Sequence, residues 1–283
     1  MIKFWWILFI FPLYGMTQSE IENYGPQGVE IYSDLKTALK IEEGVYKLDL
    51  SYKMLEAKLW SKIGKLKNLQ ALQLAANTGE IELPEDFSKL TQLVYFYSVG
   101  NAFKKLPDLI NFPNLMYIEL MGTKVDSLPN NIAYLQRLKI LKFTATEDTL
   151  KVTRNLKYLK ALKYVTIESV ILDSCPKEFF KIENLKSLTL RNCKIKALPE
   201  NLDKMKNLET LVLDNNNLTE IPRSIYKLKK LTALSLRGNK LTKIPDTICH
   251  LQNLSVLDLR GNKMDPSNLE EIQILSEGCK IIY

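Results

Sequence analysis

Apolar residues recur along most of this chain with a period of 22 to 24 residues. In the unit that starts at Leu208, leucines also stand at the fourth, sixth and eleventh places (Leu211, Leu213 and Leu218). Alternate residues of a strand face the same side, so the fourth and sixth places predict a short strand with one buried face. The period predicts stacked coils whose strands form a parallel sheet. The ten units begin at Val45, Leu69, Leu93, Leu115, Leu138, Leu162, Leu185, Leu208, Leu231 and Leu254.

A longer motif accompanies this period. The pattern L-x-x-L-x-L-x-x-N-x-L is intact over Leu208–Leu218 and Leu231–Leu241, and over Leu254–Met264 with methionine in the last place. Most units carry proline near the fifteenth place, as in Pro222 and Pro245, where an irregular coil segment needs no donor for a sheet. These motifs resemble leucine-rich repeats of the Leu-Pro class, about 23 residues long, as in bacterial-type secreted proteins.

The resemblance implies an α/β leucine-rich repeat solenoid, a horseshoe with a parallel β-sheet on its concave face. It implies about ten repeats with a cap at each end. It also implies that asparagine at the ninth place, as at Asn216, satisfies backbone groups of adjacent coils. The ninth places at Thr123, Thr146 and Val170 depart from this pattern, and we interpret the irregularity as shaping a binding site nearby.

The ends of the chain predict its organisation. Lys3, the apolar run 4–14 and the small residues Gly15 and Thr17 predict a signal peptide over 1–17, cleaved before Gln18. An N-terminal segment with a capping helix follows over 18–44, with Ser33 as the N-cap of a helix over 34–40. The repeats occupy 45–253. The last repeat and C-terminal cap occupy 254–283, with a helix from Asp265-Pro266 to about Ser276 and a final strand-like segment over 279–283.

The leader predicts export to the periplasm, the cell surface or the medium. The uncharged stretch 4–19 is shorter than the roughly 20 residues that a spanning helix needs, so we expect no stable membrane span in the mature chain. An uncleaved N-terminal membrane anchor and a cytoplasmic location are the alternatives.

The sequence offers little catalytic chemistry. His250 is the only histidine, and the net charge of +7 is spread along the chain rather than concentrated in one block. Because no phosphate-binding loop, Cys-x-x-Cys or His-x-x-x-His motif occurs, we expect no enzymatic activity, catalytic residue, cofactor or metal. We expect Cys175 and Cys193 to be buried free thiols, and leave open whether Cys249 and Cys279 form a bridge.

The second, third and fifth places of each unit set the concave surface in this fold. In the third to sixth units they place tyrosines and aliphatic residues side by side, because neighbouring strands lie about 4.8 Å apart. We therefore predict an exposed partner-binding patch with an apolar centre and polar contacts around it. This tyrosine patch consists of Val94, Tyr95, Tyr97, Met116, Tyr117, Glu119, Ile140, Lys142 and Tyr164.

These features predict a non-catalytic protein–protein interaction module that binds an unidentified protein on its concave face. The alternatives are recognition of a glycan or cell-wall polymer, with sugar rings stacked on the same tyrosines, and an intracellular signalling scaffold. We expect no nucleic-acid partner, because the predicted concave face has no long basic stripe with aromatic residues.

Overall fold

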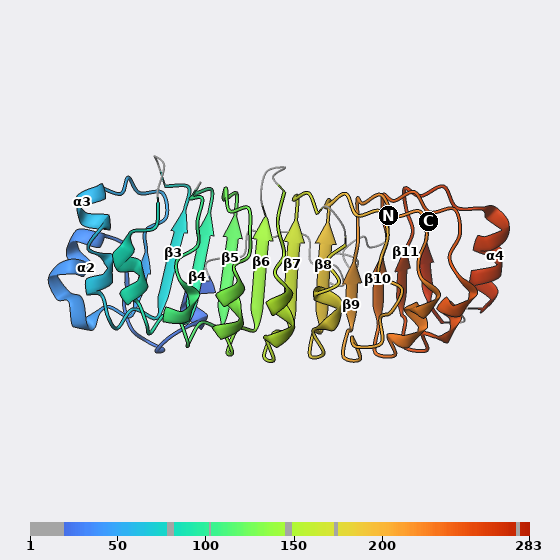
Figure 1. The fold of residues 1–283 in the computed structure, drawn as a ribbon, viewed down its shortest axis with the longest axis horizontal. Helices are drawn as coiled ribbons and strands as arrows, with labels where there is room; N and C mark the ends of the chain where they lie inside the picture. The colour runs from blue at the N-terminus through green and yellow to red at the C-terminus, as the bar shows by residue number, and fades with distance from the viewer. Residues whose placement is uncertain (1–19, 78–81, 102, 145–148, 173–174, 276–277) are drawn as a thin grey trace.

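The computed structural model describes residues 20–283, except for 78–81, 102, 145–148, 173–174 and 276–277. The predicted leader therefore lies outside the described residues. Among these residues, twelve strands form one parallel sheet in which each strand pairs with the next along the chain (Figure 1). This open sheet confirms the predicted solenoid. The strands are β1 (Ile31–Tyr32), β2 (Lys47–Asp49), β3 (Ala71–Ala75), β4 (Tyr95–Val99), β5 (Tyr117–Met121), β6 (Ile140–Thr144), β7 (Tyr164–Glu168), β8 (Ser187–Arg191), β9 (Thr210–Val212), β10 (Ala233–Ser235), β11 (Val256–Asp258) and β12 (Lys280–Ile282).

Equivalent places of successive units lie next to each other in this sheet. Leu234, for example, pairs with Leu211 on one side and with Leu257 on the other, and all three are fully buried. Short 3₁₀ turns close the coils on the other side of the core. These turns are η1 (Glu20–Asn23), η2 (Glu42–Gly44), η3 (Ile63–Lys65), η4 (Glu85–Lys89), η5 (Leu109–Asn111), η6 (Asn130–Tyr134), η7 (Arg154–Tyr158), η8 (Phe179–Lys181), η9 (Arg223–Lys227) and η10 (Asp246–His250), of which η1 and η2 lie in the N-terminal region.

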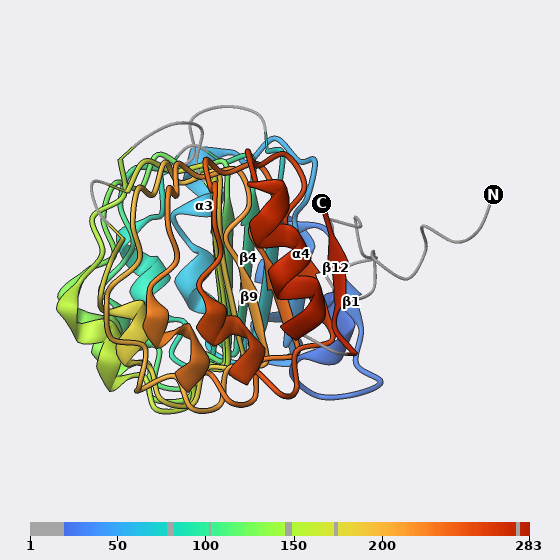
Figure 2. The same ribbon diagram turned by 90° about the vertical axis from the view of Figure 1, so that its right-hand side faces the viewer.

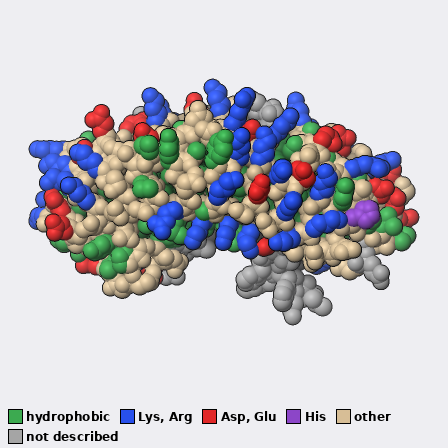
Figure 3. Space-filling view, turned by 60° about the horizontal axis from the view of Figure 1, so that its bottom comes forward, with side chains coloured by type: hydrophobic (Ala, Val, Ile, Leu, Met, Phe, Trp, Pro, Cys, Tyr) green, Lys and Arg blue, Asp and Glu red, His purple; other side chains and the backbone are tan. Residues whose placement is uncertain are grey.

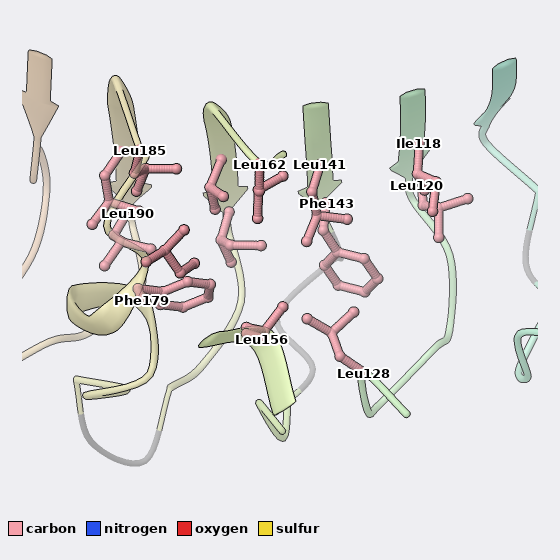
Figure 4. Packing of buried hydrophobic residues seen from close by; sticks show 14 of the residues in the cluster. Ile118, Leu120, Leu128, Leu141, Phe143, Leu156, Leu162, Phe179, Leu185 and Leu190 are labelled. Atoms are coloured by element: carbon pink, nitrogen blue, oxygen red, sulfur yellow. The ribbon is translucent and has the colours of Figure 1, made fainter. Parts of the chain in front are cut away.

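One continuous apolar core fills the space between the strands and the turns. Figure 4 shows Leu141 and Phe143 of β6 packed toward Leu156 of η7 and Phe179 of η8. Each such side chain contributes about 1.5–3 kcal/mol when it is fully buried. Because every coil contacts mainly its neighbours, stability is built up unit by unit along the stack.

The asparagine at the ninth place connects adjacent coils, as the resemblance implies. The Asn216 Oδ1 accepts hydrogen bonds from the backbone N–H groups of Cys193 (3.0 Å) and Ile195 (3.1 Å). Its Nδ2 donates to the carbonyl oxygens of Leu190 (2.7 Å) and Leu213 (2.8 Å). Asn239 and Asn262 make equivalent bonds in the next coils.

Other side chains replace asparagine in the middle of the stack. The Cys193 thiol donates weakly to the carbonyl oxygens of Arg191 and Ile167. Val170 is buried and cannot hydrogen-bond through its side chain, and the Thr123 hydroxyl is buried without a hydrogen-bond partner among the described residues. Thr146 lies outside the described residues. At the ninth place, the described residues of the central coils thus make fewer side-chain hydrogen bonds to adjacent coils than Asn216, Asn239 and Asn262 do.

Both ends of the sheet are capped. The helix α2 (Leu35–Ile41) buries Leu35 and Ala38 against the first coils, and the short helix α3 (Ala57–Trp60) follows β2. The N-cap of α2 is Asp34, whose carboxylate accepts a hydrogen bond from the Thr37 N–H at 2.7 Å. The prediction that Ser33 caps this helix is therefore wrong. The carboxylate is the stronger acceptor for the first turn of the helix.

The helix α4 (Pro266–Leu275) follows Asp265 as predicted, and Asp265 accepts from the Ser267 N–H at 3.0 Å. The strand β12 then pairs with β11 at the predicted final segment. Within the described ranges, no helix combines the length and apolar character that a membrane crossing requires.

Candidate functional site

The sheet brings the residues of the tyrosine patch together on the face opposite the core, the concave face. Tyr95 of β4 pairs with Tyr117 of β5, which pairs with Ile140 of β6. Tyr164 of β7 completes this row beside Ile140. Two places further along the strands, Tyr97, Glu119 and Lys142 form a second row. The predicted proximity of these residues is confirmed.

Their predicted exposure is wrong for three of them. Tyr95 and Tyr117 are each 1% exposed, and Glu119 is 6% exposed. For the two tyrosines the reason is an N-terminal strap, defined here as residues 20–32, which packs against this end of the concave face. Glu119 contacts Tyr117 and Lys142 instead. Figure 2 shows the strap, in blue, beside the sheet, on the side away from the short turns of the repeats. Clustered tyrosines present a large apolar area, and covering it removes that area from water.

Two side chains of the strap enter the tyrosine cluster. Ile21 is 1% exposed and belongs to the same buried cluster as Tyr95 and Tyr117. The Tyr24 ring stacks on Tyr95 with 4.7 Å between centroids and lies 5.3 Å from Tyr117. Tyr95 and Tyr117 stack on each other at 4.7 Å. Stacked aromatic pairs of this kind contribute about 0.5–1.5 kcal/mol beyond the burial of their area.

The rest of the strap follows the first strands. The strand β1 pairs with β2, and the Lys47 ammonium donates to the Glu22 carbonyl oxygen at 2.9 Å. Gly25 has φ +74° and runs so close to Gln70 that a Cβ at this position would lie 3.3 Å from the Gln70 Cβ. Glycine therefore suits this position twice, by its positive φ and by its small size.

Polar groups border the covered cluster on its C-terminal side. The Tyr117 hydroxyl donates to the Glu119 carboxylate, and Lys142 Nζ lies 3.0 Å from both the Tyr117 hydroxyl oxygen and the Glu119 Oε2. The Lys142 ammonium also lies 5.3 Å from the centroid of the Tyr117 ring. This arrangement neutralises a buried carboxylate and fixes the edge of the tyrosine cluster.

The neighbouring part of the concave face is more open. Tyr164 is 44% exposed, and Lys139 and Lys163 beside it are exposed. Ile140 and Lys142 are half-buried, as are Val94, Tyr97 and Met116 at the covered end. The predicted patch is thus divided into a part covered by the strap and a part centred on Tyr164.

A row of paired charged residues, which the sequence does not predict, follows the strand ends nearby. Arg191 lies between two carboxylates, with Nη1 3.2 Å from Glu168 Oε1 and Nη2 3.6 Å from Asp214 Oδ2. The Ser235 hydroxyl also donates to Asp214. Burial raises the pKa of Asp214 above its usual value, while the Ser235 hydrogen bond and Arg191 act in the opposite direction.

The cysteines show no sign of a reactive site. All four are free thiols, and Cys193 is fully buried. Burial raises the pKa of both Cys175 and Cys193 to about 12, so these thiols stay protonated at neutral pH and are poor nucleophiles. Across the described ranges, no three His, Cys, Asp or Glu side chains are grouped as metal ligands.

A second surface feature lies on the side of the short turns. A groove of about 610 Å³ opens between η7, η8 and residues 199–204, with Tyr158, Phe180 and Pro199 among its lining residues. Five lysines and the acidic residues Glu183, Glu200 and Asp203 also line this groove, which is called the basic groove here. Figure 3 shows lysine and arginine side chains distributed over the arched molecule. The lysines are Lys157, Lys160, Lys177, Lys181 and Lys204.

Positive charge is spread over several units of the chain, as expected from the sequence. Residues 151–206 contain 13 lysines and arginines and six acidic residues. Residues 221–263 contain nine lysines and arginines and two acidic residues, so each of these two stretches carries an excess of seven. The other residues together carry an excess of seven acidic residues.

Comparisons with known proteins match the repeats and the fold. A family model described as "Leucine rich repeat" matches residues 206–264, and one described as "Leucine Rich repeats (2 copies)" matches residues 183–226. A search of the curated proteins found no match.

Solved structures resemble most of the chain. A TDR receptor covers 90% of it with 19% identity and a TM-score of 0.70. The functional domain of InlJ from Listeria monocytogenes covers 83% with 18% identity and a TM-score of 0.62. The plant peptide hormone receptor RGFR1, solved in complex with RGF2, covers 85% with 22% identity and a TM-score of 0.61.

This chain spans 46%, 46% and 43% of these three proteins, in the same order. At such low identity the likeness concerns the fold. The intact motifs, the two family models over residues 183–264 and the parallel sheet together show that this chain folds as a leucine-rich repeat solenoid.

Proposed function

We propose that this protein is an exported, non-catalytic binding module that holds a protein or peptide partner on its concave face. The observation that carries the proposal is the strap itself. Residues 20–32 seat a segment of peptide chain on the concave face, with Ile21 and Tyr24 buried against or stacked on the tyrosines. A surface that accommodates its own segment in this way has the chemistry needed to accommodate another.

The open part of the concave face supplies the contact surface for such a partner. Tyr164 offers a large, rigid side chain with a polar end, a residue type enriched at binding hot spots. Lys139 and Lys163 surround it with positive charge, which favours a partner with carboxylates around an apolar residue. The structure of RGFR1 in complex with RGF2 provides a precedent for peptide binding within this fold.

Export is supported by the leader-like residues 1–17 of the sequence. The test is the N-terminus of the native protein, measured by mass spectrometry on separated cell fractions. We expect a chain that starts at Gln18 outside the cytoplasm. A chain that keeps Met1 in the membrane fraction indicates an anchored module, and one that keeps Met1 in the cytosol contradicts export.

Partner binding is tested with two matched full-length variants. Tyr164→Ser with Lys163→Glu changes the open concave face, whereas Tyr134→Ser with Lys157→Glu removes the same chemistry from exposed positions on the short turns η6 and η7. Cross-linking and affinity capture from the extracellular and surface fractions then compare both variants with the unchanged protein. We expect only the concave variant to lose a specific captured protein, by at least tenfold.

Equal capture by both variants contradicts binding at the open concave face. Soluble glycans added as competitors distinguish the alternative ligand, because loss of capture in their presence favours a glycan over a protein.

A further inference from the structure

The strap contacts the tyrosine cluster through a compact two-residue motif. Ile21 lies in the 3₁₀ turn η1 (Glu20–Asn23), and Tyr24 directly follows this turn. The two residues are three apart, a spacing at which side chains of a 3₁₀ turn lie on the same side. A Tyr24 N–H to Ile21 carbonyl hydrogen bond of 3.3 Å closes the turn. Both side chains therefore reach the cluster together, one aliphatic and one aromatic.

The concave face provides complementary surfaces for both side chains. The Tyr24 ring stacks on the flat face of Tyr95 at 4.7 Å with an interplanar angle of 26°. Ile21 is buried in the same cluster, which also includes Ala71. The half-buried Tyr97 and Ile140 pack around it and lead toward the open part of the face.

The strap also has features that favour its detachment from this site. Gly25 and Gly28 both have positive φ, and they separate the docked turn from β1. Such residues absorb large changes of backbone conformation and act as hinges. The strap also covers Lys47, which is 2% exposed, and desolvating its charge opposes docking, while the hydrogen bond to the Glu22 carbonyl oxygen offsets part of this cost.

We infer that the concave face selects a peptide turn with an aliphatic residue followed three residues later by an aromatic residue. The strap is the resident occupant, and a partner segment with this chemistry displaces it. This inference rests on the proposed function, because it names the kind of partner segment that the same concave face binds.

Occupation by the strap sets how the site responds to a partner. An attached segment competes at a high effective concentration, and the affinity for an outside peptide falls by the fraction of molecules in which the site is open. If the strap occupies the site in 99% of molecules, for example, the apparent affinity is about 100-fold weaker than that of the open site.

The test supplies the motif from outside. The full chain with Ile21→Ser and Tyr24→Ser removes the resident side chains and leaves Tyr95 and Tyr117 in place. A fluorescently labelled synthetic peptide of residues 20–32 is titrated into this variant and followed by anisotropy. The unchanged chain and an Ile110→Ser, Tyr134→Ser variant serve as controls, since Ile110 and Tyr134 are exposed on η5 and η6.

We expect the peptide to bind the Ile21→Ser, Tyr24→Ser variant at least tenfold more tightly than either control. We expect a peptide carrying Tyr24→Ser to lose this binding. Equal affinity for all three proteins, or equal affinity of both peptides, overturns the inference. If circular dichroism shows that the double variant is unfolded, the same titration is made with Tyr24→Ser alone.

This titration contains no outside partner, so its outcome is separate from the test of the proposed function. Failed peptide binding together with Tyr164-dependent capture rejects the strap motif and keeps the concave binding module. Successful peptide binding together with unchanged capture by the Tyr164 variant keeps the motif and rejects binding at the open face.

Discussion

At the scale of single residues, the buried asparagines differ sharply from asparagines on the rim of the coils. Asn216 makes hydrogen bonds to two backbone N–H groups and two carbonyl oxygens inside the stack. Asn184 also joins two coils, by donating to the Lys160 carbonyl oxygen at 2.9 Å, but it is exposed. Water can replace this bond and cannot reach the buried ones. Similar rim bonds are made by Asn68, Asn114, Asn207 and Asn253.

We therefore expect Asn216→Ala to lower the free energy of unfolding by about 2–4 kcal/mol, because buried backbone groups lose their partners. The matched change Asn184→Ala should cost about 0.5 kcal/mol or less. Urea denaturation of both variants measures the difference. Equal costs would show that the buried asparagine does not hold the coils together.

Asp214 makes the stability depend on pH in a defined direction. Burial raises its pKa in the folded state, so the folded protein binds this proton more tightly than the unfolded chain does. The resulting contribution to stability is complete below the unfolded pKa of about 3.9 and is lost as the pH rises through the folded value. We expect Asp214→Asn to gain stability relative to the unchanged protein between about pH 4 and pH 7. Urea denaturation along this range checks it, and a constant or falling difference contradicts it.

At the scale of elements, local repetition made the coils predictable. Each strand and each buried leucine recurs at the same place in the unit, so the sequence pattern alone predicts the sheet and its inward face. The proximity of Tyr95, Tyr117, Ile140 and Tyr164 follows from the same register. The strap carries no repeat, and it docks on strands distant in sequence. Long-range packing of this kind leaves no periodic signal, and for this reason the burial of Tyr95 and Tyr117 was not predicted.

The packing of successive turns allows a prediction at Gly64. This residue lies in η3, against η4 of the next coil, and a Cβ at Gly64 would overlap the Asp86 carbonyl oxygen. The backbone must shift, and overpacking of this kind costs about 1–3 kcal/mol. We expect Gly64→Ala to lower the melting temperature clearly. Gly44→Ala is the control, since its Cβ would meet only the side-chain Cγ2 of the exposed Ile41. Thermal unfolding that is equal for both variants contradicts the close approach.

At the scale of the whole molecule, positive charge is in excess over residues 151–206 in the middle of the solenoid and again over residues 221–263. The excess of positive charge over residues 151–206 surrounds the basic groove on one side of the coils and includes Lys163 and Lys186 on the other. A field of this kind attracts acidic partners over roughly a Debye length, about 10 Å at 0.1 M salt. Of these two stretches, residues 151–206 include Tyr164, so an acidic partner attracted to them lies close to the open concave face.

The grouping of five lysines around one groove predicts that the location of a charge matters in addition to its amount. Two double variants change the net charge equally. The first is Lys160→Glu with Lys181→Glu, and both lysines line the basic groove. The second is Lys240→Glu with Lys243→Glu, and neither lysine lines it. The first pair should therefore elute from a sulfonate cation-exchange resin at clearly lower salt than the second, because it disrupts the region that contacts the resin. Elution of both at the same salt would show that the resin senses only net charge. A real difference would mean that an acidic partner is steered to the middle of the solenoid, with an association rate that falls as salt is added.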